Sequence, residues 1–226
     1  MSSNKKSPVQ FLVILTLVVL VIMIALMFLG NKNTESTNDI KFDATPSIEG
    51  QPVLGNLDAP VTVVGFADYK CPACKVWEED YLPQLFEDYI KSGKVKFAHI
   101  NVLFHGEESI LGSLAAESIY SQSAEAYWQF HLELFHAQPS DDHDAAWITN
   151  DLIMEIASGI PEIDIDLLKT EIDSKAKMAE VEKDNQLVEE YQVELTPSIM
   201  VNGTMLEDPF DYDRLKSLVE SGLKGN

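Results

Sequence analysis

The strongest constraint on the fold is a pair of cysteines, two residues apart, between a strand-like and a helix-like segment. Cys71 and Cys74 are the only cysteines of the 226-residue chain. Residues 61–67, before the pair, are apolar and rich in β-branched side chains, which is typical of a buried strand. Residues 77–90, after the pair, carry large apolar side chains at helical spacing. We therefore predict that Cys71 lies where a strand ends and a helix begins, with Pro72 in the first helical turn.

This position has a chemical consequence for the first cysteine. The unpaired N–H groups and the dipole of a helix N-terminus stabilise a thiolate, so the pKa of Cys71 is expected to fall below the free-thiol value of ~8.5. Lys70 and Lys75 flank the pair and are expected to act in the same direction. A reactive thiolate with a second thiol one turn away is the arrangement of a redox dithiol.

Two other interpretations of the pair are weaker. A structural zinc site needs about four ligands, and His131 and His136 could complete a Cys2His2 set. Their distance from the cysteines far exceeds the usual gap, and their five-residue spacing does not align the side chains on a helix. A purely structural disulfide would close too small a loop to contribute much chain entropy. We interpret these histidines and His143 as hydrogen-bonded or solvated side chains.

The N-terminal segment predicts a membrane anchor. Residues 11–29 contain Thr16 as their only polar residue, and a run of that length can span a bilayer. We expect a signal anchor over residues 9–29 that stays attached, because the apolar run is longer than most signal peptides and no good cleavage site follows it. Secretion after signal cleavage is the alternative.

The charges around this segment predict the topology. Lys5 and Lys6 precede it, so residues 1–8 are expected to form a cytoplasmic tail and the rest of the chain to lie outside the cytoplasm. Residues 30–50 are polar at first and without periodicity, which indicates a flexible stalk. The folded domain is expected over residues 51–226.

Overall charge limits the partners. The chain has 37 acidic and 16 basic residues and a formal net charge of −21. Nucleic acid is therefore not an expected partner, because phosphate binding needs a basic surface. A hard cation such as calcium could bind the acidic surface, although no EF-hand spacing marks a site and the sequence assigns no metal ligands.

The folded part alternates strands with helices. We predict, in order, a strand at 61–67, the helix that follows Cys71, a strand at 94–103, helices at 108–121, 125–136, 147–157 and 164–190, strands at 198–201 and 204–206, and a helix from about 211. Asn202-Gly203 is a strong hairpin signal between the last two strands. Pro83 predicts a kink in the helix after the cysteines.

These residues resemble the DsbA-like thiol-disulfide oxidoreductases. The run from Val61 to Trp77 is most similar to the membrane-anchored BdbD type of Gram-positive bacteria, and the match extends from about Gln51 to the C-terminus. The resemblance implies an α/β fold, the thioredoxin fold, with an all-helical domain inserted after the second central strand at about residues 106–172.

The resemblance also implies a chemistry. It makes Cys71 the nucleophile and Cys74 the resolving cysteine, and it places Thr196 and a cis Pro197 against them. The implied activity is the introduction of disulfide bonds into reduced exported proteins, with no cofactor beyond the redox-active pair. The implied recycling partner is a quinone-linked membrane oxidoreductase of the DsbB/BdbC type. A disulfide reductase or isomerase, and a redox-inactive extracytoplasmic binding protein or chaperone on the same scaffold, are the alternatives.

The sequence departs from the family pattern at two positions. The best-known oxidants of the family carry histidine immediately before the second cysteine, where this chain has Ala73. Many relatives carry a buried glutamate, thought to relay protons to the second cysteine, where this chain has Gly65. Asp68 lies nearby in sequence and is a candidate substitute, while a solvated loop residue or a helix cap are equally good interpretations of it.

Overall fold

The computed structural model describes residues 12–21, 23, 38–140 and 145–225. It divides into two compact units, Met1–Asn38 and Asp39–Asn226. Residues 12–21 are helical. Over the described ranges, no helix is both long enough and apolar enough to cross a membrane. Residues 9–11, 22 and 24–29 of the expected anchor, the tail at 1–8, the stalk at 30–37 and His143 lie outside the described residues.

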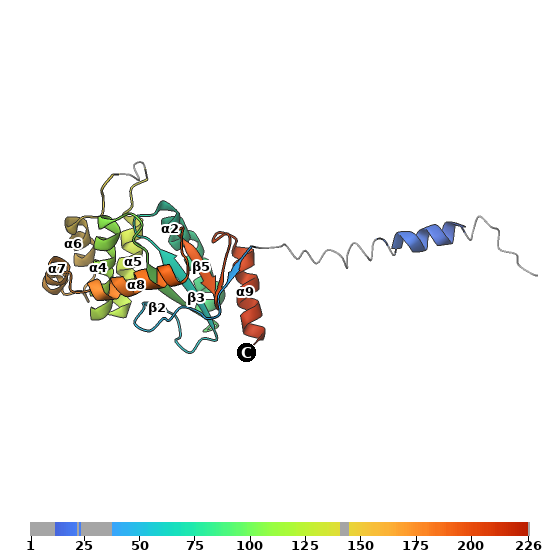
Figure 1. The fold of residues 1–226 in the computed structure, drawn as a ribbon, viewed down its shortest axis with the longest axis horizontal. Coiled ribbons are helices and arrows are strands. Elements are labelled where there is room, and N and C mark those ends of the chain that lie inside the picture. Colours follow the sequence, from blue (N-terminus) through green and yellow to red (C-terminus); the bar gives the residue numbers. More distant parts are fainter. Residues whose placement is uncertain (1–11, 22, 24–37, 141–144, 226) are drawn as a thin grey trace, which may run out of the picture. The chain divides into compact units, whose positions relative to one another are not determined.

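A six-stranded mixed sheet forms the centre of the second unit (Figure 1). Its strands are β1 (Ile40–Lys41), β2 (Val53–Leu54), β3 (Val61–Ala67), β4 (Val95–Asn101), β5 (Ser198–Val201) and β6 (Thr204–Met205). Their order across the sheet is β1-β6-β5-β3-β4-β2, with β3 and β4 parallel and every other pair antiparallel. Apolar side chains on β3 and β4 are buried on both faces, as the predicted strands require.

Helices follow the predicted pattern. The stretch after Cys71 consists of α2 (Pro72–Val76), η1 (Trp77–Tyr81), α3 (Leu82–Leu85) and η2 (Phe86–Ile90). Between β4 and β5 come α4 (Glu107–Gln122), α5 (Ala124–His136), α6 (Asn150–Ser158), α7 (Ile165–Asp173) and α8 (Met178–Glu190), and α9 (Tyr212–Lys224) ends the chain. Figure 1 shows α4 to α7 gathered on one side of the second unit, away from α9. The helical block thus enters the chain after the second central strand, where the insertion was expected.

The folded unit begins earlier than predicted. The sequence indicated a stalk up to residue 50, but β1 pairs with β6 through Ile40 and Met205. Asp39 also accepts a hydrogen bond of 2.7 Å from Nε of Arg214, on the last helix. Residues 39–50 are therefore part of the fold. Both β1 and the Asp39 carboxylate bind residues that lie more than 160 positions further along the chain.

The helix after the cysteines widens before its proline. η1 is a π-helical turn, and Leu82 closes it by donating its N–H to the carbonyl of Trp77. Pro83 then lies in the first turn of α3. Since a proline lacks an N–H and its ring crowds the preceding turn, the wider π turn accommodates it inside a continuous helical stretch.

The same helix is held on the sheet by aromatic packing. The Trp77 ring stacks on that of Phe97 on β4, with centroids 5.4 Å apart. Phe97 in turn covers Gly65, where a Cβ atom would lie 2.8 Å from the edge of the phenyl ring. Gly65 is therefore required by close packing beneath the helix that carries the cysteines.

Candidate active site

Cys71 occupies the predicted junction between strand and helix. It is the N-cap of α2, with extended backbone angles, and Pro72 is in the first helical turn. Both cysteines are free thiols, but they differ in exposure: 8% of Cys71 is accessible, whereas Cys74 is completely buried. Only the first sulfur can therefore be reached by another protein.

The two thiols also differ in acidity. A hydrogen bond from the Cys74 side chain lowers the pKa of Cys71 to about 5 despite its partial burial, with smaller contributions from the Thr196 side chain and the backbone N–H groups of Cys74 and Ala73. Burial raises the pKa of Cys74 well above the ordinary thiol value, and the neighbouring Cys71 sulfur adds to that shift. At neutral pH the pair thus holds one thiolate, on Cys71, and one thiol. The pKa of Cys71 is lowered, as predicted, but the Cys74 side chain contributes more to this shift than the backbone N–H groups of the helix start.

The flanking lysines do not act as predicted. The ammonium group of Lys70 forms an ion pair with Glu108 and donates a hydrogen bond of 2.7 Å to the carbonyl of Ala145. Lys75 lies 3.6 Å from the Glu79 carboxylate and donates to two carbonyls at the end of α5. Both charges are engaged by other groups, and the hydrogen bonds that lower the pKa of Cys71 come from its own helical turn and from Thr196.

Asp68 braces the loop before the cysteines and is not a solvated residue. Its side chain is fully buried and accepts hydrogen bonds from the Lys70 backbone N–H, at 2.9 Å, and from the Ser109 hydroxyl, at 2.9 Å. The His105 ring lies 2.8 Å from the same carboxylate. Toward Cys74, Asp68 presents its backbone N–H, 3.4 Å from the sulfur. The loop is thereby fixed so that one N–H points at the buried thiol.

The expected proline is next to the pair. The Thr196–Pro197 peptide bond is cis, as predicted. The Cys71 sulfur lies 3.4 Å from the Thr196 carbonyl oxygen, to which it donates a hydrogen bond when it is protonated. A segment 125 residues away in the chain thus forms one wall beside the accessible sulfur.

Comparison with known proteins agrees with this geometry. Residues 45–221 match the model of a family described as thioredoxin. The chain is 42% identical, over 195 residues, to disulfide bond formation protein D of Bacillus subtilis, covering 86% of each protein. A probable disulfide bond formation protein D of Bacillus cereus is 34% identical over 225 residues, 99% of this chain and 100% of that protein.

The chain belongs to the DsbA-like thiol-disulfide oxidoreductases. The solved structure of oxidised BdbD from Bacillus subtilis superposes with a TM-score of 0.78 and 41% identity, covering 81% of this chain and 98% of that one. DsbA of Chlamydia trachomatis shares the fold, with a TM-score of 0.69 and 20% identity over 80% of this chain and 96% of that one. The predicted thioredoxin fold with inserted helices is confirmed.

Position 65, where the family resemblance points to a buried glutamate in many relatives, is a tightly packed glycine in this DsbA-like chain. The Phe97 ring occupies the space that a side chain on Gly65 would need. A carboxylate does lie nearby, but on another element. Glu78 follows Cys74 by four residues, one helical turn further along the same buried side, and is 1% exposed.

Sequence reasoning missed two members of a buried cluster around this glutamate. Glu78 and His99 were not singled out, and they lie next to His131, also fully buried. The suggested Cys2His2 set does not form: among the described residues, no potential metal cluster includes either cysteine, and His136 lies 3.7 Å from Glu79 at the surface. The four-residue spacing between Cys74 and Glu78 was the only sign in the sequence that Glu78 lies on the buried side of the helix. A single glutamate on a helix is equally consistent with a solvent-exposed face, so this spacing alone did not predict the cluster.

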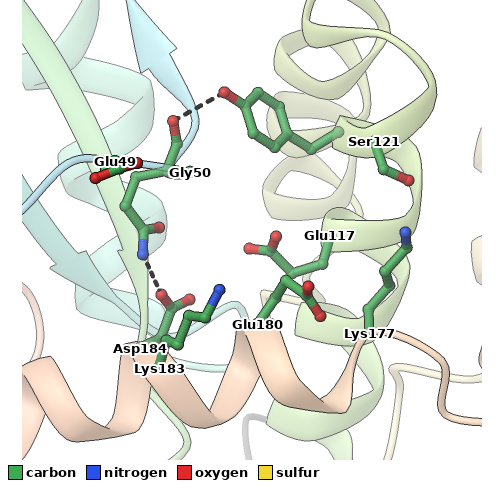
Figure 2. A pocket seen from close by; sticks show the side chains of 10 residues that line it. Glu49, Gly50, Glu117, Ser121, Lys177, Glu180, Lys183 and Asp184 are labelled. Atoms are coloured by element: carbon green, nitrogen blue, oxygen red, sulfur yellow. Dashed lines mark hydrogen bonds between the residues drawn. The ribbon is translucent and has the colours of Figure 1, made fainter.

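A second polar pocket lies between α4, α8 and the segment at residues 49–51. Figure 2 shows a pocket of about 270 Å³ in which Glu117, on α4, meets Asp184 and Glu180, on α8. The side-chain oxygen of Gln51, which also lines the pocket, is buried without a hydrogen-bond partner. Burial and the nearby Asp184 raise the pKa of Glu117 to about 8. Protonation of Glu117 at neutral pH therefore reduces the repulsion between the carboxylates of this pocket.

Proposed function

We propose that this chain is a membrane-anchored oxidase that introduces disulfide bonds into exported proteins, with Cys71 as the nucleophilic cysteine and Cys74 as the resolving one. The observation that carries the proposal is the asymmetry of the pair. Cys71 is accessible with a pKa of about 5, whereas Cys74 is buried with a raised pKa. A dithiol whose reduced form contains a stabilised thiolate gives up its disulfide readily and acts as an oxidant.

The reaction proceeds by two thiol exchanges. A substrate thiolate attacks the accessible Cys71 sulfur of the oxidised pair, a mixed disulfide forms, and Cys74 leaves and takes up a proton. A second substrate thiolate then attacks the substrate's own sulfur in that mixed disulfide. Its disulfide forms, and Cys71 is released as the thiolate that its helical turn stabilises. The substrate is oxidised by two electrons and the enzyme is reduced by the same two.

Exposed apolar side chains near the thiol suit an unfolded substrate. Leu195, directly before the Thr196-Pro197 pair, is 77% exposed, Phe104 in the turn before α4 is 48% exposed, and Val76 on α2 is 45% exposed. We propose that Thr196 and Pro197 form the wall against which the substrate segment lies, because the Thr196 carbonyl is adjacent to the Cys71 sulfur. Apolar contacts suit a surface that must accept many sequences.

The direction of the chemistry and the need for cysteine are testable together. In refolding of a reduced substrate protein, the wild type should form disulfides, and Cys71→Ser should abolish that activity. A redox-inactive chaperone would keep its effect on refolding in Cys71→Ser. In a glutathione redox titration the wild type should lie on the oxidising side of thioredoxin, at ~−270 mV. A potential at or below that value would make the protein a reductase.

The reduced enzyme needs reoxidation, and we propose a quinone-linked membrane protein of the DsbB/BdbC type as the electron acceptor. The proposed anchor at residues 9–29 would hold the redox unit beside such a partner, outside the cytoplasm. Protease added to intact cells should remove the redox unit from the membrane. Complete protection of the unit contradicts this topology, and a mature protein starting near Gly30 contradicts a retained anchor.

We also propose a calcium ion for the pocket of Glu117, Glu180 and Asp184, because hard cations prefer clustered carboxylate and amide oxygens. Lys177 and Lys183 line the same pocket and limit its negative charge. Calcium binding should release a proton, since it favours the ionised form of Glu117. Calorimetry in two buffers of different ionisation enthalpy measures that proton, and Glu117→Gln should weaken binding. Unchanged binding in this variant would contradict the site.

A further inference from the structure

Three side chains from three separate elements converge beneath the helix that carries the cysteines. Glu78 is on η1, His99 on β4 and His131 on α5, and all three are buried to at least 99%. One ligand atom from each lies within 4.8 Å of the others. Among the described residues, no other three side chains of this kind bring their ligand atoms so close together, and the carboxylates of the pocket in Figure 2 are further apart.

Hydrogen bonding does not account for this cluster. Both carboxylate oxygens of Glu78, both ring nitrogens of His99 and Nε2 of His131 are buried without a hydrogen-bond partner. Buried polar atoms in proteins almost always have a partner, so five such atoms in one place need an explanation. A proton shared between Glu78 and His131, whose facing atoms are 3.2 Å apart, and a hydrogen bond between His99 and the Asn101 side chain would satisfy only part of these five atoms.

The distances suit a single metal ion. Oε2 of Glu78 is 3.2 Å from Nε2 of His131, and Oε1 is 3.9 Å from Nδ1 of His99. In a tetrahedral zinc site with bonds of 2.0–2.2 Å, neighbouring ligand atoms are roughly 3.3–3.6 Å apart. Two imidazoles and one carboxylate form a ligand set that suits zinc, whereas calcium prefers oxygen atoms alone. We propose that Glu78, His99 and His131 bind one zinc ion, with a water molecule as the fourth ligand of the tetrahedron.

The surroundings of His131 support this assignment. The Tyr69 hydroxyl oxygen lies 2.9 Å from Nδ1 of His131 and can accept its proton, which leaves the lone pair of Nε2 directed at the cluster. Such a partner on the second ring nitrogen is usual for zinc-bound histidine.

An apolar pocket offers a route to the site. A pocket of about 320 Å³ is lined by Glu78 together with Leu82, Trp128 and other apolar residues. The Trp128 ring contacts that of His131, with centroids 5.3 Å apart. The bound ion would connect α5 of the inserted helices to β4 and to the cysteine-bearing helix. This proposal does not depend on the direction of the thiol chemistry.

The test begins with a protein whose own thiols cannot bind metal. The full-length Cys71→Ser/Cys74→Ser protein, purified in detergent and refolded with zinc, should retain one zinc ion after dialysis, measured by elemental analysis. An excess of calcium in every buffer competes with zinc for the carboxylates of the pocket in Figure 2. Cobalt used in place of zinc should give the visible absorption of a tetrahedral site, and zinc should displace it.

Matched substitutions then locate the ion. In the same background, Glu78→Gln and His99→Gln should each weaken zinc binding at least about tenfold. Glu79→Gln and His136→Gln make the same changes at neighbouring, partly exposed positions and should leave binding unchanged. Equal zinc affinity in Glu78→Gln and its control would overturn the proposal. Absence of both zinc and the cobalt absorption in the background protein would overturn it without any further variant, even if a substitution impaired folding.

Discussion

Replacement of Cys74 should show which group stabilises the Cys71 thiolate. The side chain of Cys74 is the largest cause of the low pKa, ahead of the backbone N–H groups of the same turn. A hydrogen bond to a charged group contributes ~1.5–3 kcal/mol, which corresponds to roughly 1–2 pKa units. Cys74→Ala removes the donor and should raise the pKa of Cys71 from about 5 to roughly 6–7. Cys74→Ser keeps a hydroxyl donor at this position and should leave the pKa closer to the original value.

The assay is simple because each variant has a single thiol. Thiolate absorbance and the rate of alkylation, both followed against pH, report the ionisation of Cys71 alone. Lys75→Met, in the Cys74→Ser background, is the control for long-range charge. Since the Lys75 ammonium group is engaged with Glu79 and two carbonyls, its removal should shift the pKa by less than ~0.5 unit.

The comparison of the two variants decides the cause. If alanine and serine at position 74 give the same pKa, the side-chain hydrogen bond from this position is not the cause, and the Thr196 side chain together with the backbone N–H groups of the helix start is sufficient. A large shift in Lys75→Met would refute the conclusion that the flanking lysines act elsewhere and would restore the interpretation based on sequence.

Three further predictions concern potential, stability and packing. Ala73→His should make the protein more oxidising by tens of millivolts in a glutathione redox titration, because ~1.4 kcal/mol of thiolate stabilisation corresponds to about 30 mV; an unchanged potential would show that residue 73 does not tune the thiolate. The low folded-state pKa of Cys71, about 5, stabilises the reduced protein above the unfolded-state value of ~8.5, and this contribution should be lost as pH falls from 8.5 to 5. Urea unfolding of reduced wild type and Cys71→Ser should therefore differ by on the order of 1–2 kcal/mol at pH 7 and converge near pH 5, and a constant difference would contradict the linkage. Gly65→Ala should reduce the free energy of unfolding by ~1–3 kcal/mol, since its Cβ would lie 2.8 Å from the Phe97 ring, and a neutral result would mean that the ring can move.

Local patterns in the sequence were sufficient for most of the fold. The run at residues 61–67 forms β3, and the helix starts at Pro72. These features depend on neighbours within a few residues: alternation and β-branching for strands, helical spacing for helices, and a ring without an N–H at the first turn. The position of Cys71 at a helix start, and hence the direction of its pKa shift, follows from the same short-range rules.

Short elements with distant partners were not predictable in this way. β1 has two residues and little intrinsic preference, so only its pairing with β6 makes it a strand. Lys70 and Lys75 are close to the cysteines in sequence, but in the folded chain their ammonium groups form ion pairs with Glu108 and Glu79. Asp68 is buried because Ser109 and His105, about 40 residues away, complete its hydrogen bonds.

The sequence by itself determined the chemistry of the thiol pair, because Cys71, Cys74 and their helical turn form one continuous segment. Tertiary structure alone decided what surrounds the pair. Glu78, His99 and His131 meet only when η1, β4 and α5 pack together, and nothing in the separation of these residues along the chain marks them as neighbours. The physical reason is that burial, charge and metal coordination depend on distances in space, whereas sequence patterns report only those contacts that the backbone itself keeps short.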